Sequence, residues 1–272
     1  MPLISSHVLA GTPVAAFNVI TLEHAEAIVS GAERAGLPVI LQLSENAIRF
    51  HRRPEAIAAA MVSVGASAGV PVVLHLDHIT DPSLAVRARE LGFGSVMYDG
   101  STLDFDGNVR STREVAEWGG REGVWVEAEL GEVGGKDGAH APGVRTDPAE
   151  AATFVADTGV DSLAVAVGSS HAMTSQTAEL DLDLVSRLRD AVPVPLVLHG
   201  SSGVPDAAIA AATRAGIWKV NIGTALNVAF TAGVRSRLED PAVVDPRKYL
   251  APARERVAET VAHYLGVVAG RA

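Results

Sequence analysis

Three histidines stand at the C-terminal tips of three apolar runs in this 272-residue chain. His78 ends the run VPVVLHLDH, His171 ends LAVAVGSSH, and His199 follows PLVL. If these runs are parallel strands of one barrel, their ends meet at one mouth. Three imidazoles there can hold one Zn²⁺ and leave a coordination position open. Asp77 stands beside the first histidine as a candidate acid/base, so the set indicates a metal enzyme rather than a binding module.

The elements that must position these residues form a repeating pattern. Short β-branched runs alternate with alanine-rich segments of helical period, and Pro82, Pro148 and Pro205 mark helix starts. Eight βα units in this length predict a closed (β/α)₈ TIM barrel, a single domain over 1–272 with a C-terminal helical segment at about 240–272. An open Rossmann-like sheet is the alternative. The predicted strands are 14–20, 38–44, 70–78, 95–99, 124–131, 162–168, 194–200 and 219–223.

Composition excludes several classes of function. A hydrophobic content of 48% with only 4% aromatic residues suits the Ala, Val, Leu and Ile core of a barrel. The net charge of −10 disfavours partners such as nucleic acid or an anionic membrane. The chain has no cysteine, which excludes disulfides and thiolate metal sites. We expect a soluble cytoplasmic protein, because we find neither a signal peptide nor a run of about 20 apolar residues.

Two other barrel chemistries fit the sequence less well. A metal hydrolase uses a His-x-His pair on one side of a strand, whereas His75 and His78 are three apart and are predicted to point in opposite directions. A Schiff-base enzyme needs a lysine at the mouth. Lys219 is predicted to open the last strand at the bottom of the barrel, Lys248 lies in the C-terminal segment, and Lys136 lies in the glycine-rich loop 131–143. Metal chemistry is therefore favoured.

Two glycine-rich turns predict an anion site beside the metal. HGSSG at 199–203 and NIGT at 221–224 offer backbone N–H groups where barrels commonly bind phosphate. Gly200 and Gly203 let the backbone approach an anion closely. Tight βα turns also favour Gly and Ser, but two such turns next to a metal-binding histidine favour phosphate binding.

These motifs resemble one known family. LHLDH at 74–78, VEAELGEVGG at 126–135, AVGSSH at 166–171, LHGSSG at 198–203 and KVNIGT at 219–224 resemble the class II, zinc-dependent fructose-bisphosphate and tagatose-bisphosphate aldolases. AFNV at 16–19 and QLSE at 42–45 are also similar, so the resemblance covers nearly the whole chain. It implies a zinc enzyme of carbohydrate metabolism, with glycolysis among its settings. Such an enzyme reversibly cleaves a ketose phosphate to dihydroxyacetone phosphate and an aldehyde, as a homodimer or homotetramer.

The resemblance also implies a role for each site residue. It makes Zn²⁺ the cofactor, allows a monovalent cation near the phosphate, and makes a small sugar phosphate the partner. The zinc ligands would be His78, His171 and His199, and the acid/base for the C4 hydroxyl would be Asp77. Asp99 and Glu129 would support the metal or offer it an alternate position. Asn18 and Ser44 would line the substrate pocket, and Gly200, Ser202, Asn221 and Thr224 would hold a phosphate.

Some positions depart from the family pattern. Ala172 and Ser175 stand where the family usually has glycine and a phosphate-contacting lysine. The lost cation weakens the expectation of a C1 phosphate, so a ketose without one is an alternative substrate. A non-catalytic sugar-phosphate-binding barrel is a further alternative, which the retained Asp77 disfavours. The loop acid that exchanges the carbon-bound proton aligns with Asp137, with Glu132 and His140 as alternatives. Gly223 stands where fructose-specific members tend to carry aspartate.

Overall fold

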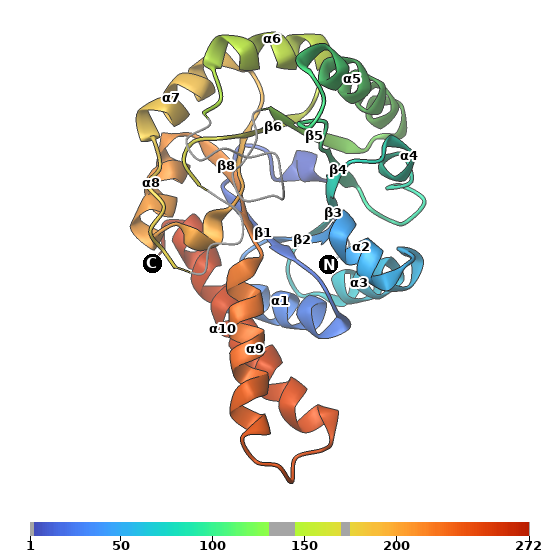
Figure 1. Cartoon of the computed structure of the whole chain (residues 1–272), viewed down its shortest axis with the longest axis vertical. Helices are drawn as coiled ribbons and strands as arrows, with labels where there is room; N and C mark the ends of the chain where they lie inside the picture. The colour runs from blue at the N-terminus through green and yellow to red at the C-terminus, as the bar shows by residue number, and fades with distance from the viewer. Residues whose placement is uncertain (1–2, 131–144, 170–174, 272) are drawn as a thin grey trace.

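The computed structural model describes residues 3–130, 145–169 and 175–271 (Figure 1). Eight parallel strands form a closed barrel in which each strand pairs with the next and β8 pairs with β1. The predicted (β/α)₈ fold is therefore confirmed. The strands are β1 (Val14–Asn18), β2 (Val39–Ser44), β3 (Val72–Ile79), β4 (Ser95–Tyr98), β5 (Trp125–Leu130), β6 (Ser162–Val165), β7 (Leu196–Leu198) and β8 (Ile217–Ile222).

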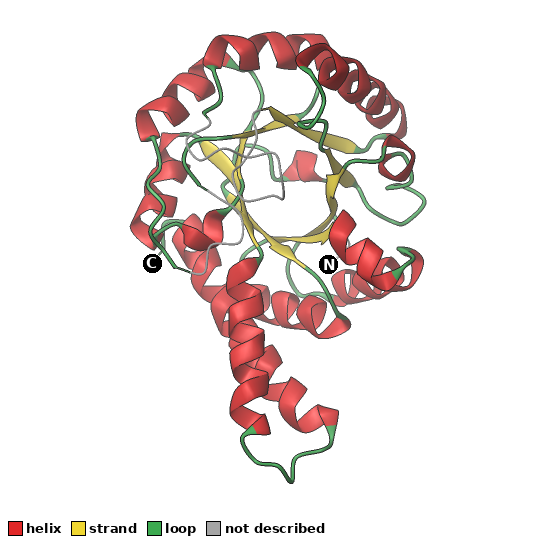
Figure 2. Cartoon of the chain, viewed as in Figure 1, coloured by secondary structure: helices red, strands yellow, loops and turns green. Residues whose placement is uncertain are grey.

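Helices surround the strands as an outer ring (Figure 2). Two helix starts follow directly from the sequence, because the side chains of Asp81 and Asp147 cap helices whose first residue is proline. α9 and α10 pack along each other and extend away from the barrel (Figure 1). The helices are α1 (Leu22–Ala35), α2 (Glu45–His51), α3 (Glu55–Ser67), α4 (Pro82–Ala85), α5 (Phe105–Glu122), α6 (Pro148–Thr158), α7 (Leu182–Ala191), α8 (Asp206–Ala215), α9 (Thr224–Leu238) and α10 (Pro246–Val268).

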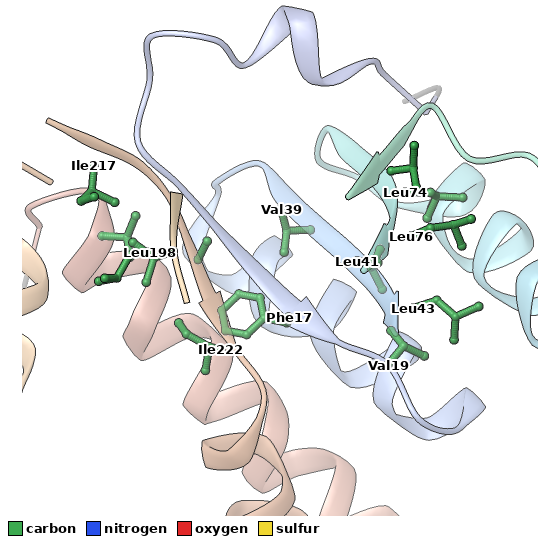
Figure 3. Close-up of a cluster of buried hydrophobic side chains, with 14 of the residues drawn as sticks. Phe17, Val19, Val39, Leu41, Leu43, Leu74, Leu76, Leu198, Ile217 and Ile222 are labelled. Carbon is green, nitrogen blue, oxygen red and sulfur yellow. The ribbon is translucent and has the colours of Figure 1, made fainter. Parts of the chain in front are cut away.

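The strand side chains divide between two cores. One set points outward and packs against the helices, and Figure 3 shows part of it, including Phe17, Leu41, Leu76 and Ile222. This layer holds the barrel inside its ring of helices. Alternate residues point inward, as the period of two along a strand requires. Within the described chain no helix combines the length and apolar character needed to span a bilayer.

An apolar plug fills the N-terminal end of the barrel. Trp125 and Trp218 are buried there, and the indole nitrogen of Trp218 donates to the carbonyl oxygen of Leu9 over 2.8 Å. The ring of His7, in the 3₁₀ turn Ser6–Val8, meets Trp125 edge-on. The polar inward-facing residues lie above this plug, toward the carboxyl ends of the strands.

Candidate active site

A pocket of about 210 Å³ opens at the carboxyl ends of the strands, which we call the mouth pocket. Eight of the predicted site residues line it, from both ends of the sequence. Sequence reasoning missed Gln42 and Asn227, although Gln42 lies two residues before Ser44 on β2 and therefore faces the same side. The lining residues are Asn18, Ile20, Gln42, Ser44, Asp77, His78, Gly200, Ser202, Asn221, Gly223, Thr224 and Asn227.

Asp77 is held by two amides. Nδ2 of Asn18 donates to Oδ2 of Asp77 over 2.8 Å, and Nδ2 of Asn221 donates to Oδ1 over 3.4 Å. Gln42 in turn donates to Oδ1 of Asn18 over 3.0 Å, which fixes the orientation of that amide. Burial alone raises the pKa of Asp77, but the nearby imidazoles of His78 and His199 outweigh it, so the pKa lies below its usual range. The side chain is therefore a carboxylate that can accept a proton.

His78 reaches the pocket through a local break in β3. The register with β4 shifts between Leu76 and Ile79, as in a β-bulge, and His78 has a φ of 49°. A left-handed conformation is uncommon for a residue other than glycine and costs of order 1–3 kcal/mol. Neighbouring residues of a regular strand point to opposite sides. Because of this break, His78 and its neighbour Asp77 both line the mouth pocket. The predicted opposition of His75 and His78 is wrong, since both lie on the inner side of the barrel.

His78, Glu129 and His199 form the metal-candidate cluster. One ligand atom from each side chain lies within 4.8 Å of the others, and Glu129 and His199 are fully buried. Oε2 of Glu129 lies 3.5 Å from Nδ1 of His78 and 3.5 Å from Nδ1 of His199. Imidazole nitrogens and a carboxylate oxygen are ordinary ligands of Zn²⁺, so the cluster fits this metal. The predicted ligand His171 and the predicted loop acid Asp137, with Glu132 and His140, lie outside the described residues.

Asp99 supports the cluster from one side. Its Oδ2 lies 2.9 Å from Nδ1 of His78, and its Oδ1 accepts hydrogen bonds from the backbone N–H and the hydroxyl of Ser101. A carboxylate that contacts an imidazole in this way orients the ring. Of the two carboxylates predicted to support the metal, Glu129 lies inside the metal-candidate cluster and Asp99 lies beside it.

A second charged pair lies one layer deeper. Glu127 contacts Nε2 of His199 through Oε1 at 3.2 Å and Nζ of Lys219 through Oε2 at 2.7 Å. The predicted position of Lys219 at the bottom of the barrel is wrong, because β8 begins at Ile217 and places Lys219 two residues into the strand. Burial raises the pKa of Glu127, but the ammonium of Lys219 and the contact with His199 hold it well below its usual range.

Burial and charge also shift two histidines in opposite directions. Burial, strengthened by the positive charge of Lys219, lowers the pKa of His75 to about 3. Burial likewise acts to lower the pKa of His199, but its contacts with Glu127 and Glu129 outweigh this and raise the pKa to about 9. His75 is therefore neutral at physiological pH, whereas His199 binds a proton tightly when no metal competes for it.

The two glycine-rich turns meet at the other side of the mouth pocket. Gly200 has a left-handed φ of 68° and opens the 3₁₀ turn Ser201–Gly203, while the N–H of Ala225 in the first turn of α9 donates to Oγ of Ser202 over 3.1 Å. The N-terminus of α9 therefore faces this turn. None of the described residues that line the pocket is lysine or arginine. Ser175 is exposed and is not among the lining residues.

Gly223 sits against the amide that orients Asp77. A Cβ atom at this position would lie 2.7 Å from Oδ1 of Asn18. Such a separation is shorter than van der Waals contact allows. A side chain at 223 therefore requires Asn18 to move.

Comparison with known proteins places this barrel in a family. The family model described as "Fructose-bisphosphate aldolase class-II" matches residues 7–271. The chain belongs to the class II fructose-bisphosphate aldolase family. It is 40% identical to a fructose-bisphosphate aldolase of Thermus caldophilus over 92% of this chain and 91% of that protein. It is also 40% identical to a 6-phospho-5-dehydro-2-deoxy-D-gluconate aldolase of Bacillus licheniformis, over 91% of this chain and 86% of the other.

A solved structure agrees with this assignment. The crystal structure of the YdjI aldolase from Escherichia coli K12 superposes with a TM-score of 0.85 at 34% identity, and covers all of both chains. Class II aldolases are zinc-dependent carbon–carbon lyases, and the buried cluster of His78, Glu129 and His199 suits that metal. Family membership, rather than the spacing of His75 and His78, excludes the hydrolase alternative.

Proposed function

We propose that this aldolase reversibly cleaves a phosphorylated ketose to dihydroxyacetone phosphate and an aldehyde. The observation that carries the proposal is the cluster of His78, Glu129 and His199, because its member His78 lines the same pocket as the Asp77 carboxylate. His78, His171 and His199 would hold Zn²⁺, with Glu129 as an alternate ligand. When bound, the metal supplies the positive charge that polarises the ketone and stabilises the negative charge left by carbon–carbon cleavage.

Asp77 is the proposed acid/base. Its carboxylate takes the proton of the C4 hydroxyl, C4 becomes an aldehyde, and the electron pair of the C3–C4 bond passes into the ketone-bearing fragment as an enediolate. In synthesis the same proton returns to the aldehyde oxygen. The hydrogen bonds from Asn18 and Asn221 support this role, because these amides hold the carboxylate in place and do not transfer a proton to it. Asp137 is the proposed loop acid that protonates C3, with Glu132 and His140 as alternatives.

Neutral groups are proposed to hold the phosphate. Gly200, Ser202, Asn221 and Thr224 supply N–H and hydroxyl donors, and the N-terminus of α9 contributes its dipole. A monovalent cation near this point would add positive charge. Replacing K⁺ by tetramethylammonium in the assay tests that part: an unchanged KM for a phosphorylated substrate excludes the cation.

The identity of the ketose is a separate question. Two relatives, each 40% identical to this chain, bear the names of different substrates, so family membership does not select one. A ketose without a C1 phosphate is the second candidate. It is favoured by Ser175, which replaces the family's lysine, and by the lack of lysine and arginine among the described lining residues.

A substrate panel tests the proposal. Ketose mono- and bisphosphates of both C4 configurations are assayed for cleavage with Zn²⁺, after chelation, and after restoring Zn²⁺ or Co²⁺. We expect cleavage to disappear with chelation and return with metal, and borohydride to leave it unchanged because no imine forms. Binding of sugar phosphates without turnover of any of them would instead support a non-catalytic barrel.

The assembly is proposed to be a homodimer or a homotetramer. Light scattering coupled to size-exclusion chromatography decides this point. A mass of 28.1 kDa, that of one chain, contradicts it.

A further inference from the structure

Five buried side chains form a continuous polar layer that lies beneath the metal-candidate cluster and ends at one of its members, His199. Each of them comes from a different strand or strand end of the barrel. At one end, Oγ of Ser95 lies 2.7 Å from Nδ1 of His75, and Nε2 of His75 lies 3.2 Å from Nζ of Lys219. The same Nζ lies 2.7 Å from Oε2 of Glu127. The other carboxylate oxygen of Glu127, Oε1, lies 3.2 Å from Nε2 of His199. Each of the five is at most 1% exposed.

Packing alone does not account for this layer. The plug below it, with Val14, Ile40 and Trp218, shows that this sequence fills the barrel with apolar side chains where no chemistry is required. A buried ion pair such as Lys219–Glu127 loses more hydration than its attraction returns unless its geometry is very favourable. An apolar pair of the same volume is often at least as stable. The charges therefore point to a task other than stability.

The direction of each hydrogen bond follows from lysine, which can only donate. Lys219 donates to Nε2 of His75, so the proton of that imidazole is on Nδ1 and is donated to Oγ of Ser95. Lys219 also forms an ion pair with Oε2 of Glu127, 2.7 Å from its Nζ. The other oxygen of Glu127 then accepts from Nε2–H of His199, and the remaining ring nitrogen of His199, Nδ1, is turned toward Glu129.

We propose that Lys219 is a positioning residue for the metal site. Its ammonium group fixes Glu127, and Glu127 fixes the ring of His199 with Nδ1 presented to the metal. A carboxylate that accepts the second ring N–H of a ligating histidine commonly sets both the orientation and the tautomer of that ring. Here the carboxylate is itself held by a buried cation. This inference rests on the proposed function to the extent that the cluster binds a divalent metal.

The first test compares Lys219→Met with the wild-type protein. Metal-free protein is titrated with Zn²⁺ in competition with a chromophoric chelator, and the Co²⁺-loaded protein is examined by absorption spectroscopy. We expect Zn²⁺ affinity to fall by about 10- to 100-fold, as for loss of other groups that orient a metal ligand, and the Co²⁺ bands to shift. Wild-type affinity together with a wild-type Co²⁺ spectrum in the folded variant overturns the proposal.

Val220→Ala is the matched control. Val220 is fully buried next to Lys219 on the same strand, but it faces the helices. This variant should lower the melting temperature and leave Zn²⁺ affinity within about threefold of wild type. A loss of affinity equal to that of Lys219→Met would mean that any disturbance of β8 has the same effect, and would also overturn the proposal.

A second variant decides the matter if Lys219→Met does not fold, since Glu127 would then be a buried charge without its cation. The pair Lys219→Met with Glu127→Gln leaves the layer neutral. We expect its Zn²⁺ affinity to be at least tenfold below wild type, whereas wild-type affinity overturns the proposal. Cleavage by wild-type enzyme tests the proposed function, and the ratio of metal affinities tests the role of Lys219, so the two can fail separately.

Discussion

Asn18 and Asp77 are joined end to end across the mouth of the barrel, with Nδ2 of Asn18 donating to Oδ2 of Asp77 over 2.8 Å. The side-chain amide of Asn18 is held against a flip, because its Oδ1 accepts a hydrogen bond from Nε2 of Gln42. The carboxylate of Asp77 is therefore fixed by neutral donors on one side and faces the pocket on the other. This arrangement suits a group that must gain and lose one proton in a fixed place.

Replacing Asp77 by alanine should separate the two proton transfers of the reaction. We expect cleavage to fall by a factor of about 10²–10⁴, the usual contribution of a general acid/base. Exchange of the α-proton of dihydroxyacetone phosphate should continue, because the proposed loop acid, and not Asp77, handles that proton. The measurement is cleavage rate against tritium or deuterium exchange, with bound Zn²⁺ quantified. A parallel fall of both rates at full zinc occupancy would exclude Asp77 as the dedicated C4 acid/base.

Ser175→Lys should restore a cation that the family usually has. A lysine–phosphate contact is worth about 1.5–3 kcal/mol, so KM for a C1-phosphorylated ketose should fall by about 10- to 100-fold. Ser175→Met, of similar length and without charge, is the control and should leave KM unchanged. Equal effects of lysine and methionine would show that bulk rather than charge matters at this position.

Gly223→Asp should impair the enzyme rather than make it selective for fructose-type substrates. The new Cβ atom would lie 2.7 Å from Oδ1 of Asn18, so Asn18 must move and its hydrogen bond to Asp77 is lost. We expect kcat to fall by about tenfold or more for ketoses of both C4 configurations, consistent with the loss of at least one charge-assisted hydrogen bond. Wild-type enzyme, with glycine here, should turn over the two epimers at comparable rates. A strong preference of wild-type enzyme for fructose 1,6-bisphosphate contradicts this interpretation of Gly223.

His75 should make the metal-free protein sensitive to acid. Its folded-state pKa is about 3 against 6.5 for a free histidine, so between these values the unfolded chain takes up a proton that the folded protein does not. The free energy of unfolding should then fall by about 1.4 kcal/mol per pH unit as pH drops below 6.5. His199, whose pKa is raised, is protonated in both states below pH 6.5 and contributes its opposite slope only above it.

Denaturant unfolding of wild-type and His75→Gln protein at pH 5, 6 and 7 measures this slope. The variant should lose stability less steeply toward acid than wild type. Identical slopes would show that His75 does not stay neutral in the folded protein.

The sequence predicted the barrel and most of the mouth because both depend on local patterns. β-Branched runs of fixed spacing predict strands, and parallel strands bring His78 and His199 to the same end. The break at His78 could not be predicted, because a β-bulge depends on the pairing of β3 with β4 rather than on the residues of β3. Lys219 was misplaced for a related reason. The last strand begins two residues earlier than predicted, and this moves the lysine from the bottom of the barrel to the layer beneath the metal-candidate cluster.

The apolar plug has a kinetic consequence. Trp125, Trp218 and Leu9 fill the N-terminal end of the barrel. We therefore expect the substrate to enter, and both products to leave, through the mouth pocket. Under the proposed function the phosphorylated fragment is held by the metal and the phosphate-binding groups, so we expect the aldehyde to depart first and the reaction to follow a compulsory order. Dihydroxyacetone phosphate should then be a competitive inhibitor with respect to the ketose. The aldehyde should be a noncompetitive inhibitor with respect to the ketose. The reverse inhibition pattern would show that the phosphorylated fragment leaves first and that the aldehyde is the last product released.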